Sequence, residues 1–203
     1  MKIICIGRNY AAHTEELKNE QPAEPVVFIK PDSAILVSGN PFFLPDFSQN
    51  IHYELELIVR IDRLGKNIQQ KFAHKYYNEI GLGIDFTARD LQDDLKKKGL
   101  PWEKSKAFDG SAVIGAWTSK NQYNNINNLN FELRINGLVV QQGVTSLMLY
   151  SIDRIIEEVS KYFTLKIGDI IFTGTPSGVG QVHPNDLLEG YLEGKKCLEL
   201  RVK

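Results

Sequence analysis

Two glutamates separated by one residue form the first candidate site in the sequence. Glu54 and Glu56 lie in residues 53–61, where apolar residues alternate with charged ones. Such alternation predicts a half-buried strand with one polar face. Side chains two residues apart leave the same face of a strand with their backbones about 6.6 to 6.8 Å apart. Two carboxylates this close need a shared positive charge, and an oxygen-only ligand set favours Mg²⁺, Mn²⁺ or Ca²⁺ over zinc.

A third acidic residue decides how the glutamate pair is interpreted. From Glu54 and Glu56 alone we would favour a solvated face of an edge strand. Asp85, however, ends a predicted strand over residues 80–84, at a position where open sheets often place ligand-binding side chains. Asp85 could instead serve as a turn residue or a helix cap. A metal site made by the three carboxylates is the hypothesis we carry forward.

His52 leaves a second metal hypothesis open. By alternation it shares a strand face with Glu54 and Glu56. One histidine with carboxylates is close to the ligand set of non-haem Fe(II) oxygenases. Periodicity alone does not distinguish that site from a magnesium or manganese site.

A possible general base lies near the N-terminus. His13 and Glu16 are three residues apart in a candidate helix over residues 11–19, so they share one helix face. There a carboxylate can orient an imidazole and raise its basicity. Two solvent-exposed polar residues would show the same spacing.

Two further features could bind an anion. Lys106 could neutralise an anionic substrate, although it is one of many lysines. Residues 174–180 resemble a loop that offers backbone N–H groups to an anion, but they lack the spacing of a phosphate loop or a dinucleotide fingerprint. A nucleotide site is therefore disfavoured.

The elements that must position these residues can be predicted from local patterns. We expect strands over residues 1–6, 26–30, 34–37, 53–61, 80–84, 170–173 and 197–202. We expect helices over residues 11–19, 71–79, 87–98 and 151–163, the third with a capping box at Thr87 and Asp90. Asn136 and Gly137 predict the turn of a hairpin whose strands are residues 130–135 and 138–140.

Composition excludes several functional classes. The chain has 203 residues, which fits one domain, 1–203, with 24 basic and 25 acidic side chains and a formal charge of −1. Apart from Lys96, Lys97 and Lys98 it has no block of like charge, which argues against nucleic acid. No apolar run is long enough for a membrane span and no signal peptide is evident, so we expect no membrane association and a cytoplasmic protein. Cys5 and Cys197 lack metal or redox spacing and receive no chemical role.

Taken together and in order, the motifs resemble the fumarylacetoacetate hydrolase family. The resemblance covers nearly the whole chain and is closest to the short single-domain branch that includes acylpyruvases and oxaloacetate decarboxylases or tautomerases. It is carried by five segments, which are residues 7–16, 52–56, 83–90, 106–110 and 174–180.

The resemblance implies a fold, an assembly and roles for particular residues. The fold would be α+β but mostly β, a mixed β-sandwich roll with a few short helices, working as a homodimer. Glu54, Glu56 and Asp85 would bind Mg²⁺ or Mn²⁺, with His52 a neighbour and not a ligand. The remaining roles concern the substrate: a His13–Glu16 dyad on a segment that can order as a lid, Lys106 facing developing negative charge, and substrate contacts from Arg8, Tyr10, Arg89, Gln92 and Thr175.

The family resemblance implies a small 2-oxo or 2,4-dioxo acid as substrate. A 2-oxo acid can chelate one metal ion through its carboxylate and keto oxygens. We place first the hydrolysis of a C–C bond in acylpyruvates or fumarylpyruvate through a metal-stabilised pyruvate enolate, and second the decarboxylation or keto-enol tautomerisation of oxaloacetate. An Fe(II) oxygenase using His52 and a non-enzymatic binding module are more distant alternatives.

Overall fold

The computed structural model describes residues 1–16 and 21–203, and its fold is mostly β with short helices. The strands are β1 (Lys2–Gly7), β2 (Val26–Pro31), β3 (Ile51–Tyr53), β4 (Leu55–Ile61), β5 (Tyr77–Asp85), β6 (Thr87–Ala88), β7 (Ala112–Ile114), β8 (Thr118–Ser119), β9 (Asn130–Ile135), β10 (Leu138–Val144), β11 (Ile170–Phe172), β12 (Gly180–Gln181), β13 (Leu187–Leu192) and β14 (Lys195–Arg201). The α-helices are α1 (Ala11–Glu16), α2 (Gln70–Ala73), α3 (Arg89–Lys97), α4 (Glu103–Lys106) and α5 (Ile152–Tyr162). Short 3₁₀ turns are η1 (Asp32–Ala34), η2 (Lys120–Gln122), η3 (Ile126–Asn128) and η4 (Thr145–Leu147).

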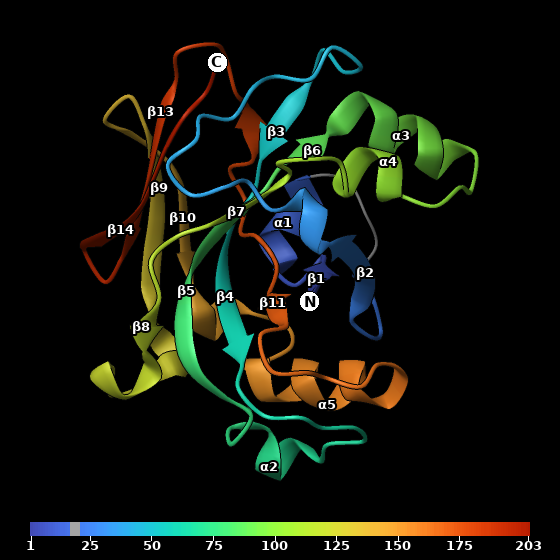
Figure 1. The fold of residues 1–203 in the computed structure, drawn as a ribbon, viewed down its shortest axis with the longest axis vertical. Helices are drawn as coiled ribbons and strands as arrows, with labels where there is room; N and C mark the ends of the chain where they lie inside the picture. Colours follow the sequence, from blue (N-terminus) through green and yellow to red (C-terminus); the bar gives the residue numbers. More distant parts are fainter. Residues whose placement is uncertain (17–20) are drawn as a thin grey trace.

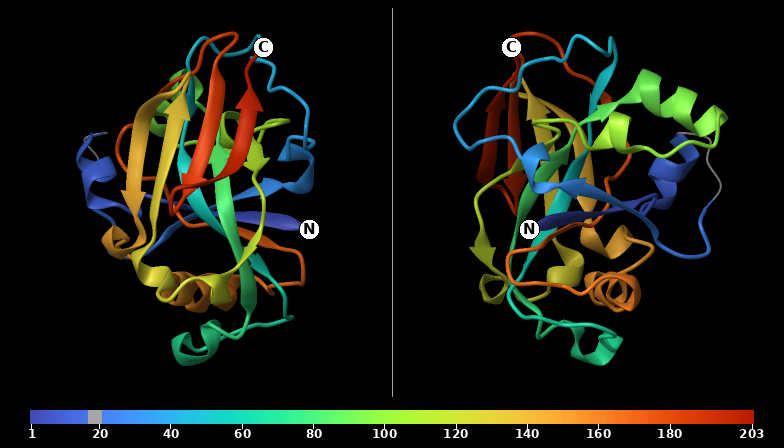
Figure 2. Two further views of the ribbon diagram at one scale, coloured as in Figure 1. Left: turned by 90° about the vertical axis from the view of Figure 1, so that its left-hand side faces the viewer. Right: turned by 45° about the vertical axis from the view of Figure 1, so that its right-hand side comes forward.

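Three sheets make up the molecule (Figure 1). The largest has the order β2-β1-β11-β4-β5-β7, with β8 paired to β5. In it β1 and β11 pair in parallel, and the other strand pairs are antiparallel. A second sheet has the order β10-β9-β13-β14, and a small third sheet joins β12, β3 and β6. The two views of Figure 2 show the second sheet standing beside β4 and β5, with α5 crossing below them. The predicted mostly β, mixed-sheet architecture is confirmed.

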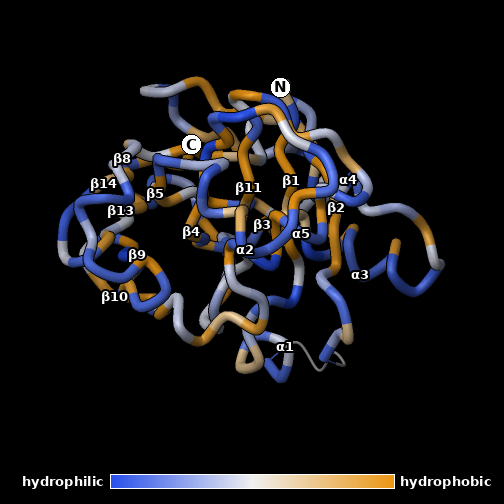
Figure 3. The backbone as a smooth tube through the Cα atoms, turned by 90° about the horizontal axis from the view of Figure 1, so that it is seen from below, coloured by the Kyte–Doolittle hydropathy of each residue, from blue (hydrophilic) through white to orange (hydrophobic). Residues whose placement is uncertain are grey.

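The core lies where the central strands pack against the second sheet and α5. Both faces of β4 are buried, and Leu55, Leu57, Ile58 and Val59 have no exposed surface. Figure 3 shows hydrophobic residues along β1 and β11 in the middle of the molecule and mainly hydrophilic ones along α3 at its edge. Burial of a central strand on both faces is typical of strands covered from two sides. The polar face expected of residues 53–61 is therefore not a solvent face: Glu54 and Glu56 point into the protein.

Several local predictions are confirmed. Strands β1, β2, β11 and β14 begin and end close to the residues predicted for them. The hairpin of β9 and β10 turns at Asn136 and Gly137, which both have positive φ, as a tight turn of this type requires. Ser151 caps α5 by accepting a hydrogen bond from the Arg154 backbone N–H at 3.4 Å. The predicted helix 11–19 is helical over Ala11–Glu16, and its remaining residues lie outside the described ones.

Other local predictions are wrong, each because pairing between strands outweighs a local pattern. Residues 71–79 are helical only over Gln70–Ala73, since Tyr77 and Glu79 already pair with β4. The segment 34–37 forms the end of η1 and one isolated bridge, from Ile35 to Ala112, in place of a strand. Strand 53–61 is split at Glu54, because β3 joins the small sheet and β4 joins the large one.

The predicted capping box at the start of α3 is also wrong. Thr87 pairs with His52 in the small sheet, and α3 begins two residues later with no side-chain cap. The Asp90 carboxylate instead accepts hydrogen bonds from the Ser48 hydroxyl and the Gln49 backbone N–H. These bonds anchor the start of α3 to the segment that precedes β3.

No helix in the described ranges is both long and apolar enough to cross a membrane.

Candidate active site

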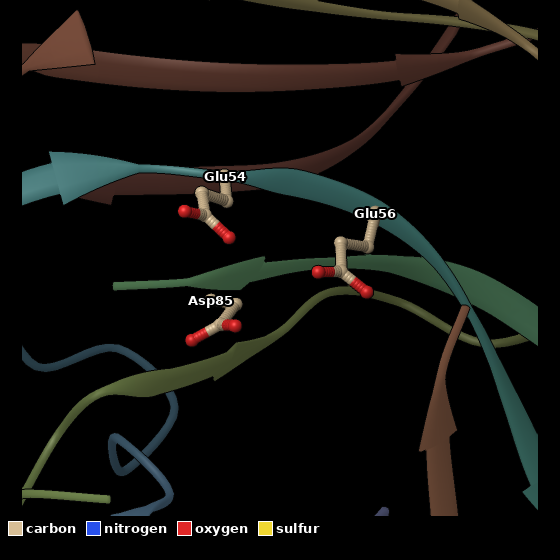
Figure 4. Close-up of side chains that lie close together, drawn as sticks. All are labelled: Glu54, Glu56 and Asp85. Atoms are coloured by element: carbon tan, nitrogen blue, oxygen red, sulfur yellow. The ribbon is translucent and has the colours of Figure 1, made fainter. Parts of the chain in front are cut away.

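Three buried carboxyl groups meet where β4 and β5 lie side by side. Glu54 immediately precedes β4, Glu56 is its second residue, and Asp85 is the last residue of β5. One oxygen from each lies within 4.8 Å of the others. Figure 4 shows all three side chains on the same side of the two strands. The antiparallel pairing explains the meeting, because Leu55 pairs with Ile84 and brings the end of β5 next to Glu54 and Glu56.

Three cations pair with this acidic cluster: Lys106, Arg89 and Lys30. Lys106, at the end of α4, donates to Glu54 Oε2 and Asp85 Oδ2 at 2.8 Å each, and to the Thr87 hydroxyl at 2.6 Å. Arg89, the first residue of α3, donates from Nη2 to Glu54 Oε1 at 2.5 Å. Burial alone would raise the pKa of Glu54, but these two cations hold it well below its usual range. Burial alone would lower the pKa of Lys106, and the two carboxylates raise it above its usual value.

The environment of Glu56 fits a bound cation. Burial raises the pKa of Glu56 well above its usual range, and the negative charges of Asp85 and Glu54 add to the effect. Its one strong donor is the Gly174 backbone N–H, at 2.6 Å, and within residues 1–16 and 21–203 it forms no ion pair. Asp85 Oδ1 accepts no hydrogen bond from the described residues, although Lys30 Nζ lies 2.7 Å away. Three converging carboxylates, of which Glu56 has no ion-pair partner among the described residues, match the hard, oxygen-only ligand set of Mg²⁺ or Mn²⁺.

Lys30 is a buried residue of the site that the sequence analysis missed. It lies in β2 with no exposed surface, and its ammonium group contacts Asp85, the Ser111 hydroxyl at 3.0 Å and the Lys106 backbone carbonyl. It thereby ties β2 to the segment that carries Lys106. A lysine inside an otherwise apolar strand was the available signal, because buried lysines are almost always paired.

The predicted dyad is present beside the carboxylates. His13 Nδ1 lies 3.3 Å from Glu16 Oε2, and the imidazole is 5 % exposed. Burial lowers the pKa of His13 below its ordinary 6.5, and Arg89 lowers it further, against the opposite effects of Glu54 and Glu16. Assigning the Nδ1 proton to the bond with Glu16 leaves Nε2 as a free base. The histidine is thus poised to accept a proton near neutral pH.

The glycine-containing loop, residues 174–180, directs its N–H groups at the protein's own acids. Gly174 N–H donates to Glu56, and Gly178 N–H donates to both oxygens of Glu16 at 3.0 and 3.2 Å. Gly174 has φ +102°, and a Cβ there would lie 2.6 Å from the Cβ of Asn9, so only glycine fits. The loop was expected to offer its N–H groups to an external anion. In the structure they bind two carboxylate side chains of the site, those of Glu56 and Glu16.

A small pocket opens beside the triad, with a cavity volume of about 30 Å³. Of the predicted substrate contacts, Arg8, Arg89, Gln92 and Thr175 line it. Arg89 Nη1 donates to Gln92 Oε1 at 2.7 Å, so the two side chains lie together at the pocket. Tyr10 is not brought to the pocket: it packs in the hydrophobic core with its hydroxyl unpaired among the described residues.

Gln141, in β10, is a second buried residue that the sequence analysis missed. Its Oε1 accepts the Leu55 N–H at 3.0 Å, and its Nε2 donates to the Thr175 hydroxyl at 2.8 Å and the Pro176 carbonyl at 2.9 Å. Leu55 lies between the two glutamates, so Gln141 holds both the ligand strand and the loop that follows β11. Sequence offered no signal, because the neighbouring Gln142 is exposed and looks the same.

Comparison with known proteins identifies the family. The family model described as fumarylacetoacetate (FAA) hydrolase, C-terminal, matches residues 2–203. This chain belongs to the fumarylacetoacetate hydrolase family. A mitochondrial oxaloacetate tautomerase from Bos taurus is 42 % identical over 201 residues, which is 99 % of this chain and 91 % of the relative. A mitochondrial oxaloacetate decarboxylase from Dictyostelium discoideum is 39 % identical over 194 residues, which is 95 % of this chain and 89 % of the relative.

Solved structures of this family share the fold over the whole chain. A family protein from Yersinia pestis superposes with a TM-score of 0.95 at 38 % identity, covering 100 % of this chain and 93 % of the other. Fumarylpyruvate hydrolase from Pseudomonas aeruginosa, solved in complex with Mn²⁺ and pyruvate, superposes with a TM-score of 0.93 at 34 % identity, covering 100 % and 89 %. The chain is therefore a metal-dependent enzyme of the fumarylacetoacetate hydrolase family, and the alternative of a non-enzymatic binding module is wrong.

The position of His52 disfavours the iron alternative. Its Nδ1 accepts a hydrogen bond from Arg89 Nε at 3.4 Å, and Arg89 in turn binds Glu54. Among the described residues, the ligand atoms that converge come from three carboxylates and no histidine. His52 is a neighbour of the site, as the family resemblance implied.

Proposed function

We propose that this protein is a divalent-metal-dependent enzyme acting on oxaloacetate, interconverting its enol and keto forms, with decarboxylation of oxaloacetate as a second activity of the same site. This ranking differs from the initial one, which placed acylpyruvate hydrolysis first. The two relatives named for oxaloacetate chemistry, at 42 % and 39 % identity, favour the change.

The observation that carries the proposal is the charge of the pocket. Its lining holds three acids and four cations, which are Glu54, Glu56, Asp85, Arg8, Arg89, Lys96 and Lys106. A divalent ion on the acids leaves the lining with an excess of three positive charges. A dianion such as oxaloacetate neutralises more of this excess than a monoanion such as acetylpyruvate, and opposite charges attract most strongly where water is scarce.

Glu54, Glu56 and Asp85 would hold the metal ion. When bound, a Mg²⁺ or Mn²⁺ ion supplies a Lewis acid for the carboxylate and carbonyl oxygens of a 2-oxo acid. Lys106, which is already hydrogen-bonded to two of the three ligands, would keep positive charge beside the carbonyl oxygen as it becomes negative.

Tautomerisation needs one proton to move, and His13 is the group placed to move it. In the keto-to-enol direction Nε2 takes a proton from C3, the C3–H electron pair forms the C2–C3 double bond, the carbonyl π pair moves to the oxygen, and the imidazolium returns the proton to that oxygen. Glu16 holds the other ring nitrogen and stabilises the imidazolium that forms. Decarboxylation breaks the C3–C4 bond: CO₂ leaves, the bonding pair forms the C2–C3 double bond of pyruvate enolate, and protonation of C3 gives pyruvate, so no base is required.

C–C bond hydrolysis is the second candidate function. The superposition with fumarylpyruvate hydrolase supports it. The same His13–Glu16 pair could remove a proton from water as it attacks a distal carbonyl. Homodimer formation and a cytoplasmic location remain predictions from the sequence.

An assay under anaerobic conditions tests the proposal. Purified protein is given oxaloacetate or acetylpyruvate with Mg²⁺, Mn²⁺ or EDTA, and enol absorbance, CO₂ and pyruvate are followed separately against the metal without protein. Metal-dependent loss of oxaloacetate enol faster than CO₂ release would support tautomerase activity, and matched rates would support decarboxylation. Turnover of acetylpyruvate alone would reject the proposed ranking in favour of hydrolysis.

A further inference from the structure

Of three consecutive lysines at the end of α3, one differs from the others in its surroundings. Lys96 lines the pocket beside the triad, whereas Lys97 and Lys98 are exposed and do not line it. Lys98 pairs instead with Asp94, at 2.7 Å on the surface. Helix geometry explains the difference, because Arg89, Gln92 and Lys96 are spaced as i, i+3 and i+7 and share one face of α3.

Lys96 lies near the C-terminal end of α3, whereas the triad lies at the N-terminal end of this helix. Arg89 contacts Glu54 at the first residue of the helix, and Lys96 comes seven residues later, about 10.5 Å farther along the axis. A long helical side chain points back toward the helix N-terminus, so its ammonium reaches toward the pocket. The Trp102 ring covers it, with Nζ 5.5 Å from the ring centroid.

The ammonium of Lys96 has no carboxylate partner in the part of the chain that the structure describes. Within residues 1–16 and 21–203, no carboxylate oxygen lies within ion-pair distance of it, and three of the four charged groups that act on its pKa are cations. Burial lowers the pKa of Lys96, and the charge of Arg89 lowers it further; Asp93 opposes this, and Arg8 and Lys106 add smaller lowering effects. Arg8 also lines the pocket. It directly follows β1, and its own backbone has φ +60°. Among the described residues, Lys96 and Arg8 form no ion pair, and two pocket-lining cations of this kind favour an anionic ligand.

We propose that Lys96, together with Arg8, binds the distal carboxylate of a dicarboxylic 2-oxo acid and so selects dianionic over monoanionic substrates. The proposal rests on the proposed function, since it assumes that the triad holds the 2-oxo acid end of the substrate. Lys96 is then a specificity-determining residue, and Lys97, one residue away on the solvent side, is a matched control.

A binding experiment separates this proposal from catalysis. L-Malate and 2-hydroxybutyrate differ in one group, a terminal carboxylate in place of a methyl, and neither undergoes the proposed reactions. Their dissociation constants are measured by calorimetry in saturating Mn²⁺ for the native protein and for Lys96→Gln, Lys96→Arg and Lys97→Gln. Loss of a hydrogen bond to a charged group predicts that Lys96→Gln weakens malate binding roughly ten- to a hundredfold.

The other measurements fix what the loss means. Binding of 2-hydroxybutyrate should change less than about twofold in Lys96→Gln, because that ligand has no distal carboxylate, and Lys96→Arg should retain most of the preference for malate, because it retains the charge. Lys97→Gln should match the native protein. Equal weakening of both ligands by Lys96→Gln, or equal effects of Lys96→Gln and Lys97→Gln, would overturn the proposal.

Turnover distinguishes failure of this proposal from failure of the proposed function. If the native protein prefers malate through Lys96 yet does not convert oxaloacetate, the dicarboxylate site stands and the reaction is wrong. If it converts oxaloacetate and Lys96→Gln leaves KM unchanged, the reaction stands and the role of Lys96 is rejected. The expected result is a KM for oxaloacetate raised roughly ten- to a hundredfold with kcat changed far less.

Discussion

Replacing Glu56 by glutamine should have opposite effects on the protein with and without metal. Glu56 is buried next to two other carboxyl groups and has no ion-pair partner among the described residues. Its pKa is raised in the folded state, so its ionised form destabilises the metal-free protein at neutral pH. Glutamine has the same shape, removes this charge and can still accept the Gly174 N–H. The metal-free variant should therefore unfold at a higher temperature than the native protein, and it should bind metal poorly.

The size of the metal effect follows from linkage and chain length. Metal at about 100 times its Kd stabilises a folded protein by about 2.7 kcal/mol. For a chain of 203 residues this corresponds to a rise in Tm of about 6 °C. Changing an outer partner of a metal ligand lowers affinity about 10- to 100-fold, so loss of a ligand should cost at least about 100-fold. At the same metal concentration, the rise in Tm for Glu56→Gln should then fall to about 1 °C.

Thermal unfolding followed by circular dichroism, in EDTA and in Mn²⁺, measures both effects. Glu158→Gln is the control, because Glu158 is a buried glutamate of α5 that pairs with Arg154 and Lys161 away from the pocket. It should lower the Tm in EDTA and leave the Mn²⁺ shift intact. If Glu56→Gln shows the native Mn²⁺ shift, Glu56 is not a ligand and the interpretation of the triad is refuted.

Three further predictions concern the dyad and the residue that holds the loop. His13→Asn should abolish enolisation of oxaloacetate while the Mn²⁺ shift in Tm stays within about 1 °C of native, because His13 does not belong to the triad. Since burial keeps the pKa of His13 below 6.5, its base form persists under mildly acidic conditions, and kcat/KM should fall with acid only below pH 6.5; a fall that begins well above that value would contradict the assignment. Gln141→Leu leaves the buried Leu55 N–H without its partner and should lower the free energy of unfolding by about 3 kcal/mol. Calorimetry should show this as a fall in Tm of about 7 °C. Gln142→Leu, on the exposed side, should change the free energy of unfolding by less than about 0.5 kcal/mol.

The acidic part of the site could be predicted because it depends on short-range geometry. Glu54 and Glu56 share a face by the period of two of an extended chain, and Asp85 ends the neighbouring strand. Antiparallel pairing then brings the three together. The same holds for His13 and Glu16, which are one helical turn apart and meet at 3.3 Å. In each case the contact is made within one element or between two paired strands.

The residues that surround the acids could not be predicted, because their positions depend on packing between distant segments. Lys30 reaches Asp85 from β2, and Gln141 reaches Leu55 from the second sheet, 86 residues along the chain. No local period marks either contact. The wrong helix over residues 71–79 has a related cause: Tyr77 and Glu79 are held as a strand by partners in β4 that the local pattern does not contain.

The loop over residues 174–180 shows why a correct pattern can point to the wrong ligand. Its backbone N–H groups were expected to bind an external anion, and in the structure they bind Glu56 and Glu16. These two carboxylates differ in position, since Glu56 belongs to the acidic triad and Glu16 lies against His13. Because Gly174 and Gly178 are four residues apart in one loop, a shift of this loop would change the hydrogen bonds to Glu56 and Glu16 together. The loop therefore links the triad to the dyad. A substitution that strains the loop should weaken metal binding and proton transfer together.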